Sequence, residues 1–422
     1  MSNVKLYPVM ELMDIYYGYK YGWLPKLLEV SNTVMLRPET KLGEAFSRRV
    51  SIKQYLTEEY NIPMEVLKGL KIMLDHGIFV NNEDFSKIFG VPKSPRSLIE
   101  IYDVLGVSYG LAYDIPSRLH MEIAVEIALS KILHKSPNDK ILKALHPSMR
   151  VYVEKLANIL LTYIKSDNSA FETSHSISNL KRKMYELMSQ DNREDTFAEL
   201  HDALYTLSEK TVRETIKNLE EQLKFKTKSG KNLFGLVPVV QGLYEEHARE
   251  CLINIIDLLI NYEELSAEAD KKYVYIAIGT GGRVLSSKEA KMINKLMQAG
   301  IDYARKLNVN VRFHVLGWSS PKIAKRLKVE LIYSSDSLSA RRRAVEGKVY
   351  MLTKDDKIRL VHVTNIDPNS WNCSCPVCSV PKLRRYVLDP SGSRKNDARI
   401  VHNLWIIKQY MLSLREKQIG GA

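Results

Sequence analysis

Short apolar runs that alternate with helical segments restrict the fold of this 422-residue chain more than any other feature. Each run ends in a polar or glycine-containing turn, which is typical of strands buried in a parallel sheet. The segments between them have helical periodicity; in 247–265, for example, Cys251, Ile255 and Leu258 or Leu259 share one face. This alternation predicts an α/β protein with a (β/α)8 TIM barrel, or failing that a doubly wound sheet. The predicted strands lie within 70–80, 107–117, 233–242, 273–282, 309–320 and 328–337.

Residues 165–232 interrupt the alternation, because they are highly charged and rich in helix-forming residues. We interpret them as a helical insertion on the barrel rim. A nucleic-acid clamp, a dimer contact and a solvated decoration remain open as its role. The expected organisation is a first part of the barrel in 1–164, this insertion, a second part of the barrel in 233–370, and a small C-terminal subdomain with a closing helix in 371–422.

The charge of the chain favours a polyanionic partner. It has 62 basic and 49 acidic residues, a net charge of +13. An excess of this size suits nucleic acid first, although a lysine-rich solvated surface would also produce it. There is no signal-type segment and no run of apolar residues long enough to span a membrane. With only four cysteines, a disulfide framework is not expected. We therefore expect an intracellular, cytoplasmic protein without a membrane partner.

Polar residues follow most of the predicted strands. In a barrel enzyme the loops after the strands form the active site, so these residues are expected to share one pocket. Two carboxylates facing one bond can perform retaining glycosyl transfer, one as the nucleophile and the other as the acid and base. Other carboxylate chemistry and simple helix capping remain alternatives. The strand-end residues are Asp75, Asp114, Gln241, Gly281, Gly282 and Asp336.

Three of the four cysteines lie close together near the C-terminus. Cys373, Cys375 and Cys378 form a C-x-C-x2-C pattern, and His402 follows 24 residues after the last of them. Three thiolates and one imidazole make a closed tetrahedral site, which is the usual coordination of structural Zn²⁺. We therefore predict a structural zinc ion as the cofactor, with no open position for catalysis.

Taken in order along the chain, the segments that carry the strand-end residues and the cysteine cluster resemble those of the tRNA-guanine transglycosylase superfamily. Its members are (β/α)8 enzymes that exchange a guanine base for a 7-deazaguanine. The resemblance implies that Asp336 is the nucleophile and Asp75 the general acid and base. It further implies that Asp114, Gln241 and the backbone of Gly281 and Gly282 read the base, that Phe79 stacks on it, and that Cys373, Cys375, Cys378 and His402 bind zinc. The segments are "MLDHGIF", "GLAYDIPS", "FGLVPVVQG", "AIGTGGRVLS", "HVLGWSSP", "IYSSDSLSARRRAVEGKVYM" and "CSCPVC" with "VHNL".

Basic residues lie near the predicted nucleophile and near the cysteine cluster. They would neutralise phosphates beside the reacting nucleotide, although an ordinary solvated surface explains them equally well. These residues are Arg341, Arg342, Arg343, Lys382, Arg384 and Arg385.

The chain departs from the superfamily's pattern at several positions. His76 replaces a serine, Val80 replaces a glutamine, and the valine-glycine-glutamate after the glycine pair is absent. Between the cysteine cluster and Ala422 we also find no segment that resembles the C-terminal RNA-binding modules of archaeal tRNA enzymes. The expected activity is therefore a pentosyltransferase that places a 7-deazaguanine, of preQ0-like type, in DNA. The first alternative is a tRNA-guanine transglycosylase. A catalytically silent nucleic-acid-binding relative is a second alternative, which the sequence favours less. A homodimer or a helper ATPase remains open.

Overall fold

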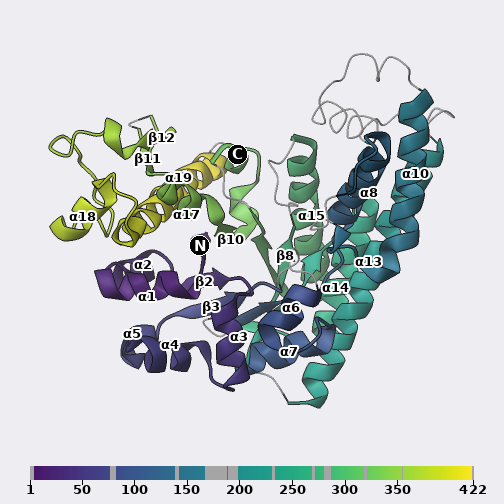
Figure 1. Cartoon of the computed structure of the whole chain (residues 1–422), viewed down its shortest axis with the longest axis horizontal. Coiled ribbons are helices and arrows are strands. Elements are labelled where there is room, and N and C mark those ends of the chain that lie inside the picture. The colour runs from purple at the N-terminus through teal and green to yellow at the C-terminus, as the bar shows by residue number, and fades with distance from the viewer. Residues whose placement is uncertain are drawn as a thin grey trace.

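The fold is a barrel of parallel strands surrounded by helices (Figure 1). The computed structural model describes residues 4–76, 82–137, 142–166, 188, 198–230, 233–268, 271–279, 287–317, 321–353 and 355–420. Within these ranges nine parallel strands form a nearly closed barrel, which confirms the predicted α/β TIM-barrel class. They are β1 (Lys5–Met10), β2 (Thr33–Leu36), β3 (Lys71–Leu74), β4 (Tyr109–Leu111), β5 (Gly235–Val237), β6 (Val239–Val240), β8 (Lys271–Ile278), β9 (Asn310–Val315) and β10 (Ile332–Ser337).

The strands β5 and β6 are two parts of one barrel strand, separated by Pro238. Proline has no N–H to donate to the sheet, so the ladder is interrupted at this residue. Before the interruption β5 pairs with β4, and after it β6 pairs with β8. Pairing of β1 with β10 joins the remaining ends, so the strands follow one another around the barrel in an eight-strand circuit.

Each of the six predicted strand segments overlaps a barrel strand, whereas β1 and β2 were not predicted. Two further strand pairs within the described ranges are antiparallel. β7 (Ser266–Glu268) pairs with β8, and β11 (Lys348–Leu352) pairs with β12 (Ile358–His362) in a hairpin that precedes the cysteine cluster.

Helices cover the outside of the barrel (Figure 1). The face of α14 with Cys251, Ile255 and Leu259 is fully buried, as the periodicity predicts. None of the helices in the described ranges is long and apolar enough to cross a lipid bilayer. The helices are α1 (Leu12–Tyr21), α2 (Leu24–Val30), α3 (Thr40–Ser47), α4 (Ile52–Tyr60), α5 (Met64–Leu67), α6 (Asn82–Phe89), α7 (Pro95–Val104), α8 (Ser117–Ile132), α10 (Arg150–Ser166), α13 (Ala198–Lys228), α14 (Glu245–Asn261), α15 (Ser287–Lys306), α16 (Pro321–Ala324), α17 (Leu338–Val345), α18 (Pro381–Leu388) and α19 (Ala398–Gly420).

The predicted insertion is helical where it is described. Its main element is α13, a helix of 31 residues, while residues 167–187 and 189–197 lie outside the described ranges. α13 packs against α7, α8, α10 and α14. Figure 1 shows α8, α10 and α13 side by side at one flank of the barrel. The helix is therefore an integral part of the barrel wall.

The interior of the barrel holds a cluster of aliphatic and aromatic side chains, separate from the core between strands and helices. Its aromatic members are Tyr7, Tyr273, Tyr275 and Tyr333. The Arg312 guanidinium lies 3.9 Å from the ring centre of Tyr273 and 4.4 Å from that of Tyr333, within the range of cation–π attraction. Burial raises the pKa of Tyr7 to about 12, so its hydroxyl stays protonated. This packed layer supports the pocket at the carboxyl ends of the strands.

Candidate functional site

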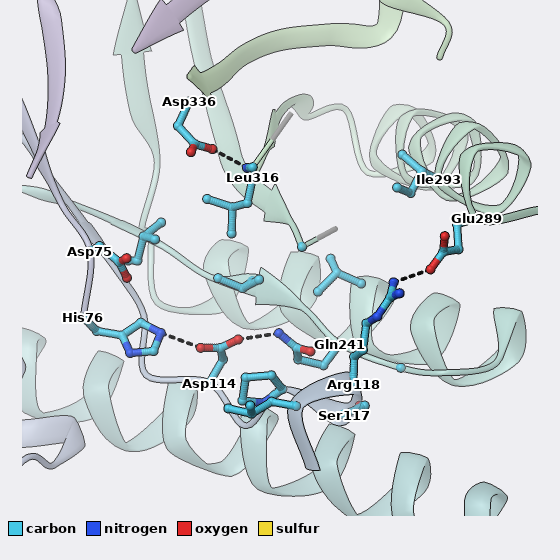
Figure 2. A pocket seen from close by; sticks show the side chains of 18 of the residues that line it. Asp75, His76, Asp114, Ser117, Arg118, Gln241, Glu289, Ile293, Leu316 and Asp336 are labelled. Atoms are coloured by element: carbon cyan, nitrogen blue, oxygen red, sulfur yellow. Dashed lines mark hydrogen bonds and ion pairs between the residues drawn. The ribbon is translucent and has the colours of Figure 1, made fainter. Parts of the chain in front are cut away.

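A cavity of about 270 Å³ lies at the carboxyl ends of the barrel strands (Figure 2). Its apolar lining includes Met35, Leu111 and Val239, which also belong to the interior cluster. Four of the predicted site residues, Asp75, Asp114, Gln241 and Asp336, line this one cavity. The other three, Phe79, Gly281 and Gly282, lie outside the described residues.

Asp336 lies near the end of β10 and is almost completely buried, with 4% of its surface exposed. Its Oδ1 accepts a hydrogen bond of 2.5 Å from the backbone N–H of Gly317, in the turn after β9. Gly317 has a φ of 68°, a left-handed conformation that favours glycine. The hydrogen bond fixes the carboxylate at the rim of the cavity (Figure 2).

A buried histidine lies below this carboxylate. His314 on β9 has no exposed surface, and its Nε2 is 3.6 Å from Asp336 Oδ1. Its Nδ1 is 2.9 Å from Ser334 Oγ, which in turn is 2.6 Å from the hydroxyl of Tyr275. A chain of polar groups therefore leads from the barrel interior to Asp336. Sequence reasoning missed His314, whose only signal is a histidine within an otherwise apolar strand.

Asp75 follows β3 and is more accessible than Asp336, since 17% of its side chain is exposed. Its backbone N–H donates to the carbonyl of Leu36, which holds the residue against β2. Arg37 Nε lies 4.0 Å from Asp75 Oδ2, and about half of the arginine side chain is exposed. Burial lowers the pKa of the Lys93 ammonium group to about 8. The negative charges of Asp75 and Asp114 act on the same group and oppose this shift.

Asp114 lies between two polar side chains at the floor of the cavity (Figure 2). Its Oδ1 is 2.5 Å from His76 Nε2, and its Oδ2 accepts a hydrogen bond from the Gln241 side-chain amide. His76 and Asp114 are 2% and 5% exposed. A carboxylate has about four lone-pair positions, so Asp114 can still accept two donors from a ligand. His76 was noted in the sequence only as a departure from the superfamily pattern.

Gln241 is aimed into the cavity by a tight bend after β6. Its backbone N–H donates to Cys251 Sγ over 3.4 Å, and burial raises the pKa of this cysteine to about 12, which keeps it a thiol. Gly242 has a φ of 143°, and a Cβ there would lie 2.6 Å from the backbone nitrogen of Ala248. The bend therefore requires glycine.

The cavity extends past Gln241 to an ion pair that the sequence did not reveal. Arg118, near the start of α8, binds Glu289 of α15, and its Nε is 3.7 Å from Glu122. Figure 2 shows the pair on the side of the pocket away from Asp75. Both side chains are about a quarter exposed, so they can reach a ligand.

Three of the six predicted phosphate-binding residues are only partly exposed and make contacts within the protein. Arg341 binds Asp14 at 3.0 Å and Glu11 at 2.8 Å, and Arg343 binds Glu346 at 2.7 Å. Arg384 donates to the carbonyls of Trp371 and Pro368. The other three residues are exposed, and phosphate binding stays a prediction for all six. The exposed residues are Arg342, which also pairs with Glu346, and Lys382 and Arg385 on α18.

Cys373, Cys375, Cys378 and His402 lie together, as predicted, and could bind a metal ion. Their ligand atoms are all within 4.8 Å of one another. His402 Nδ1 is 3.5, 3.3 and 3.6 Å from the three sulfur atoms. Its Nε2 is 2.8 Å from the carbonyl oxygen of Tyr350, to which it must donate. This bond leaves the Nδ1 lone pair directed at the sulfurs, the tautomer that metal ligation requires.

Replacing one of these cysteines should release the metal. In Cys375→Ser, a buried thiolate ligand is lost, and we expect loss of bound metal with a fall of about 5 °C or more in the unfolding temperature. Metal content by elemental mass spectrometry and thermal unfolding measure the two effects. Cys251→Ser is the matched control, because this buried cysteine lies outside the cluster and its variant should keep the metal. Full metal content in Cys375→Ser would contradict the assignment.

Comparisons with known proteins do not identify the chain. No protein-family model matches it, and no curated protein sequence is significantly similar to it. What the cavity and the cysteine cluster do must therefore be inferred from their own residues and geometry.

Proposed function

We propose that this chain is a guanine transglycosylase of the tRNA-guanine transglycosylase type, a pentosyltransferase that exchanges guanine in DNA for a 7-deazaguanine. The observation that carries the proposal is the arrangement of three carboxylates in one cavity. Asp336 and Asp75 lie at its rim, at the ends of separate strands, and Asp114 lies at its floor with Gln241. Two carboxylates suit glycosyl transfer, and the third suits recognition of a base.

In the first half of the reaction, a guanosine is flipped out of its stack into the cavity. A carboxylate oxygen of Asp336 attacks C1′, and the bond from C1′ to N9 breaks as the glycosyl ester forms. Asp75 donates a proton to the departing guanine, which leaves neutral. The N–H of Gly317 holds Asp336 in a fixed orientation for this attack.

In the second half, the incoming 7-deazaguanine occupies the place of guanine. Asp75, now a carboxylate, accepts the proton from its N9 while N9 attacks C1′. The ester bond to Asp336 breaks, and the carboxylate is regenerated. Two displacements at C1′ retain the configuration of the glycosidic bond.

Asp114 and Gln241 supply the selectivity. A carboxylate accepts hydrogen bonds from both N1–H and the exocyclic amine of guanine, whereas adenine presents a different pattern. His76 and Gln241 hold this carboxylate from its two sides, so its free lone pairs face the cavity. A 7-deazaguanine has the same donor edge and enters equally well.

The cysteine cluster fits zinc. A tetrahedral ion with Zn–S bonds of about 2.3 Å and Zn–N bonds of about 2.0–2.1 Å separates sulfur from nitrogen by about 3.6 Å. The separations of 3.3 to 3.6 Å are close to this value. Bound zinc would supply stability without chemistry, since the four protein ligands complete its coordination.

Removing the nucleophile tests the mechanism directly. Asp336→Asn keeps the size of the side chain but removes the anionic oxygen, so base exchange should fall at least about 1,000-fold and no covalent adduct should form. Incorporation of labelled guanine and mass spectrometry of a trapped adduct measure these effects. Asp302→Asn, at an exposed aspartate of α15, should behave as wild type. Retained exchange in Asp336→Asn would exclude it as the nucleophile.

The choice between DNA and tRNA is tested with both polymers side by side. We expect labelled guanine, or a labelled 7-deazaguanine, to enter duplex DNA in preference to bulk tRNA. The departures of the sequence from the tRNA enzymes favour this outcome. Incorporation into tRNA alone would support the tRNA-modifying alternative. Incorporation into neither, with metal bound, would support a silent binding protein.

A further inference from the structure

One face of α13 carries buried polar residues, which we call the polar seam. They are spaced three, four or seven residues apart, so they form a row along a single side of the helix. Each is at most 3% exposed, and the helix also buries apolar residues such as Leu204 and Leu219. The polar seam consists of Ser208, Thr211, Thr215, Gln222 and Lys226.

The middle of the polar seam binds the segment that carries Asp114. Gln222 Oε1 accepts the backbone N–H of Tyr113 at 2.9 Å, and Thr215 Oγ1 accepts that of Ile115 at 3.0 Å. These are the two residues on either side of Asp114. After Pro116, which has no N–H, the Ser117 hydroxyl lies 2.5 Å from Thr211 Oγ1.

The ends of the polar seam bind the strand and the loop on either side of Gln241. Ser208 Oγ accepts the backbone N–H of Leu243 at 2.9 Å. At the other end, Lys226 pairs with Glu264 at 2.5 Å, and Glu264 accepts the N–H of Leu236 in β5. One helix is therefore bonded to both segments that meet at the floor of the cavity.

The seam satisfies donors that have no partner in the sheet. Beyond β4 the chain leaves the barrel ladder, and the buried N–H groups of Tyr113 and Ile115 would be left without a partner if the seam were apolar. Their bonds fix the backbone on each side of Asp114, and the carboxylate direction with it. A carboxylate that recognises two adjacent donors of a base can be displaced by only about 0.5 Å before this recognition is lost.

We propose that α13 sets the base selectivity of the pocket, with Thr215, Gln222 and Ser208 acting as positioning residues for Asp114 and Gln241. The inference rests on the proposed function, since it assigns Asp114 and Gln241 to the base. Comparing guanine with hypoxanthine as the incoming base distinguishes this positioning role from general stabilisation of the fold. Hypoxanthine lacks the 2-amino group, so a misdirected Asp114 loses its preference for guanine.

The test replaces the hydrogen-bonding groups of the seam with apolar groups of similar size. In Thr215→Val and in Gln222→Leu, we expect KM for guanine to rise about 10-fold and the preference for guanine over hypoxanthine to fall by a similar factor. The value of kcat should change far less, because neither residue touches the reacting atoms. Thr215→Ser keeps the hydroxyl and should restore the wild-type values. Lys217→Ala, at an exposed position of the same helix, is the matched control.

Amide hydrogen exchange provides a readout that does not depend on activity. In Thr215→Val the Ile115 amide, and in Gln222→Leu the Tyr113 amide, should exchange at least about 10-fold faster. The Ala112 amide, which donates to the Val237 carbonyl at 2.9 Å, should be unchanged. Thr215→Ala, which adds no methyl group to the seam, is measured alongside in case Thr215→Val folds poorly.

The two readouts separate this inference from the proposed function. Faster amide exchange with an altered KM and selectivity supports the positioning role. Unchanged amides, or unchanged KM and selectivity in folded variants, overturn it. If the wild-type protein exchanges no base with any polymer, the proposed function fails, and this inference fails with it even where the amides respond.

Discussion

The site depends on closure of the barrel at Pro238. Because the proline divides one strand into β5 and β6, the first half pairs with β4 and the second with β8. Asp75 and Asp336 are far apart in the sequence, yet both strand ends reach the same rim. Parallel pairing directs every carboxyl end to one face, so the cavity is a direct consequence of the topology. The bend after β6 then brings Gln241 against Asp114.

Much of this arrangement could be predicted from the sequence, because it depends on local patterns. Buried strands leave apolar runs, and the residues after them are the ones that meet at the mouth of a barrel. The two missed strands explain where this reasoning fails. β1 contains Pro8, which is unusual inside a strand, whereas β2 is as long as the predicted β3 and has no such feature. Both are fixed by pairing with neighbours distant in the chain.

The partners of the site residues could not be predicted, since they depend on which side chains meet across the fold. Nothing local marks His314 as the neighbour of Asp336, or Thr215 as the acceptor for Ile115. The same limit affects Arg341, because a run of three arginines gives no indication that two acids at the start of α1, Glu11 and Asp14, lie beside it. A polar residue inside a charged helix is equally uninformative until the loop that it binds is known.

The cysteine cluster and the cavity are connected through α19. Its Asn403 follows His402 and donates to the carbonyls of Ala340 and Lys348 while accepting the N–H of Tyr350. Ala340 belongs to α17, the helix that directly follows the strand of Asp336. A metal ion bound at His402 would therefore also help to order the helix that follows the proposed nucleophile. α13 therefore binds the segment that carries Asp114, while α19 binds the helix that follows Asp336.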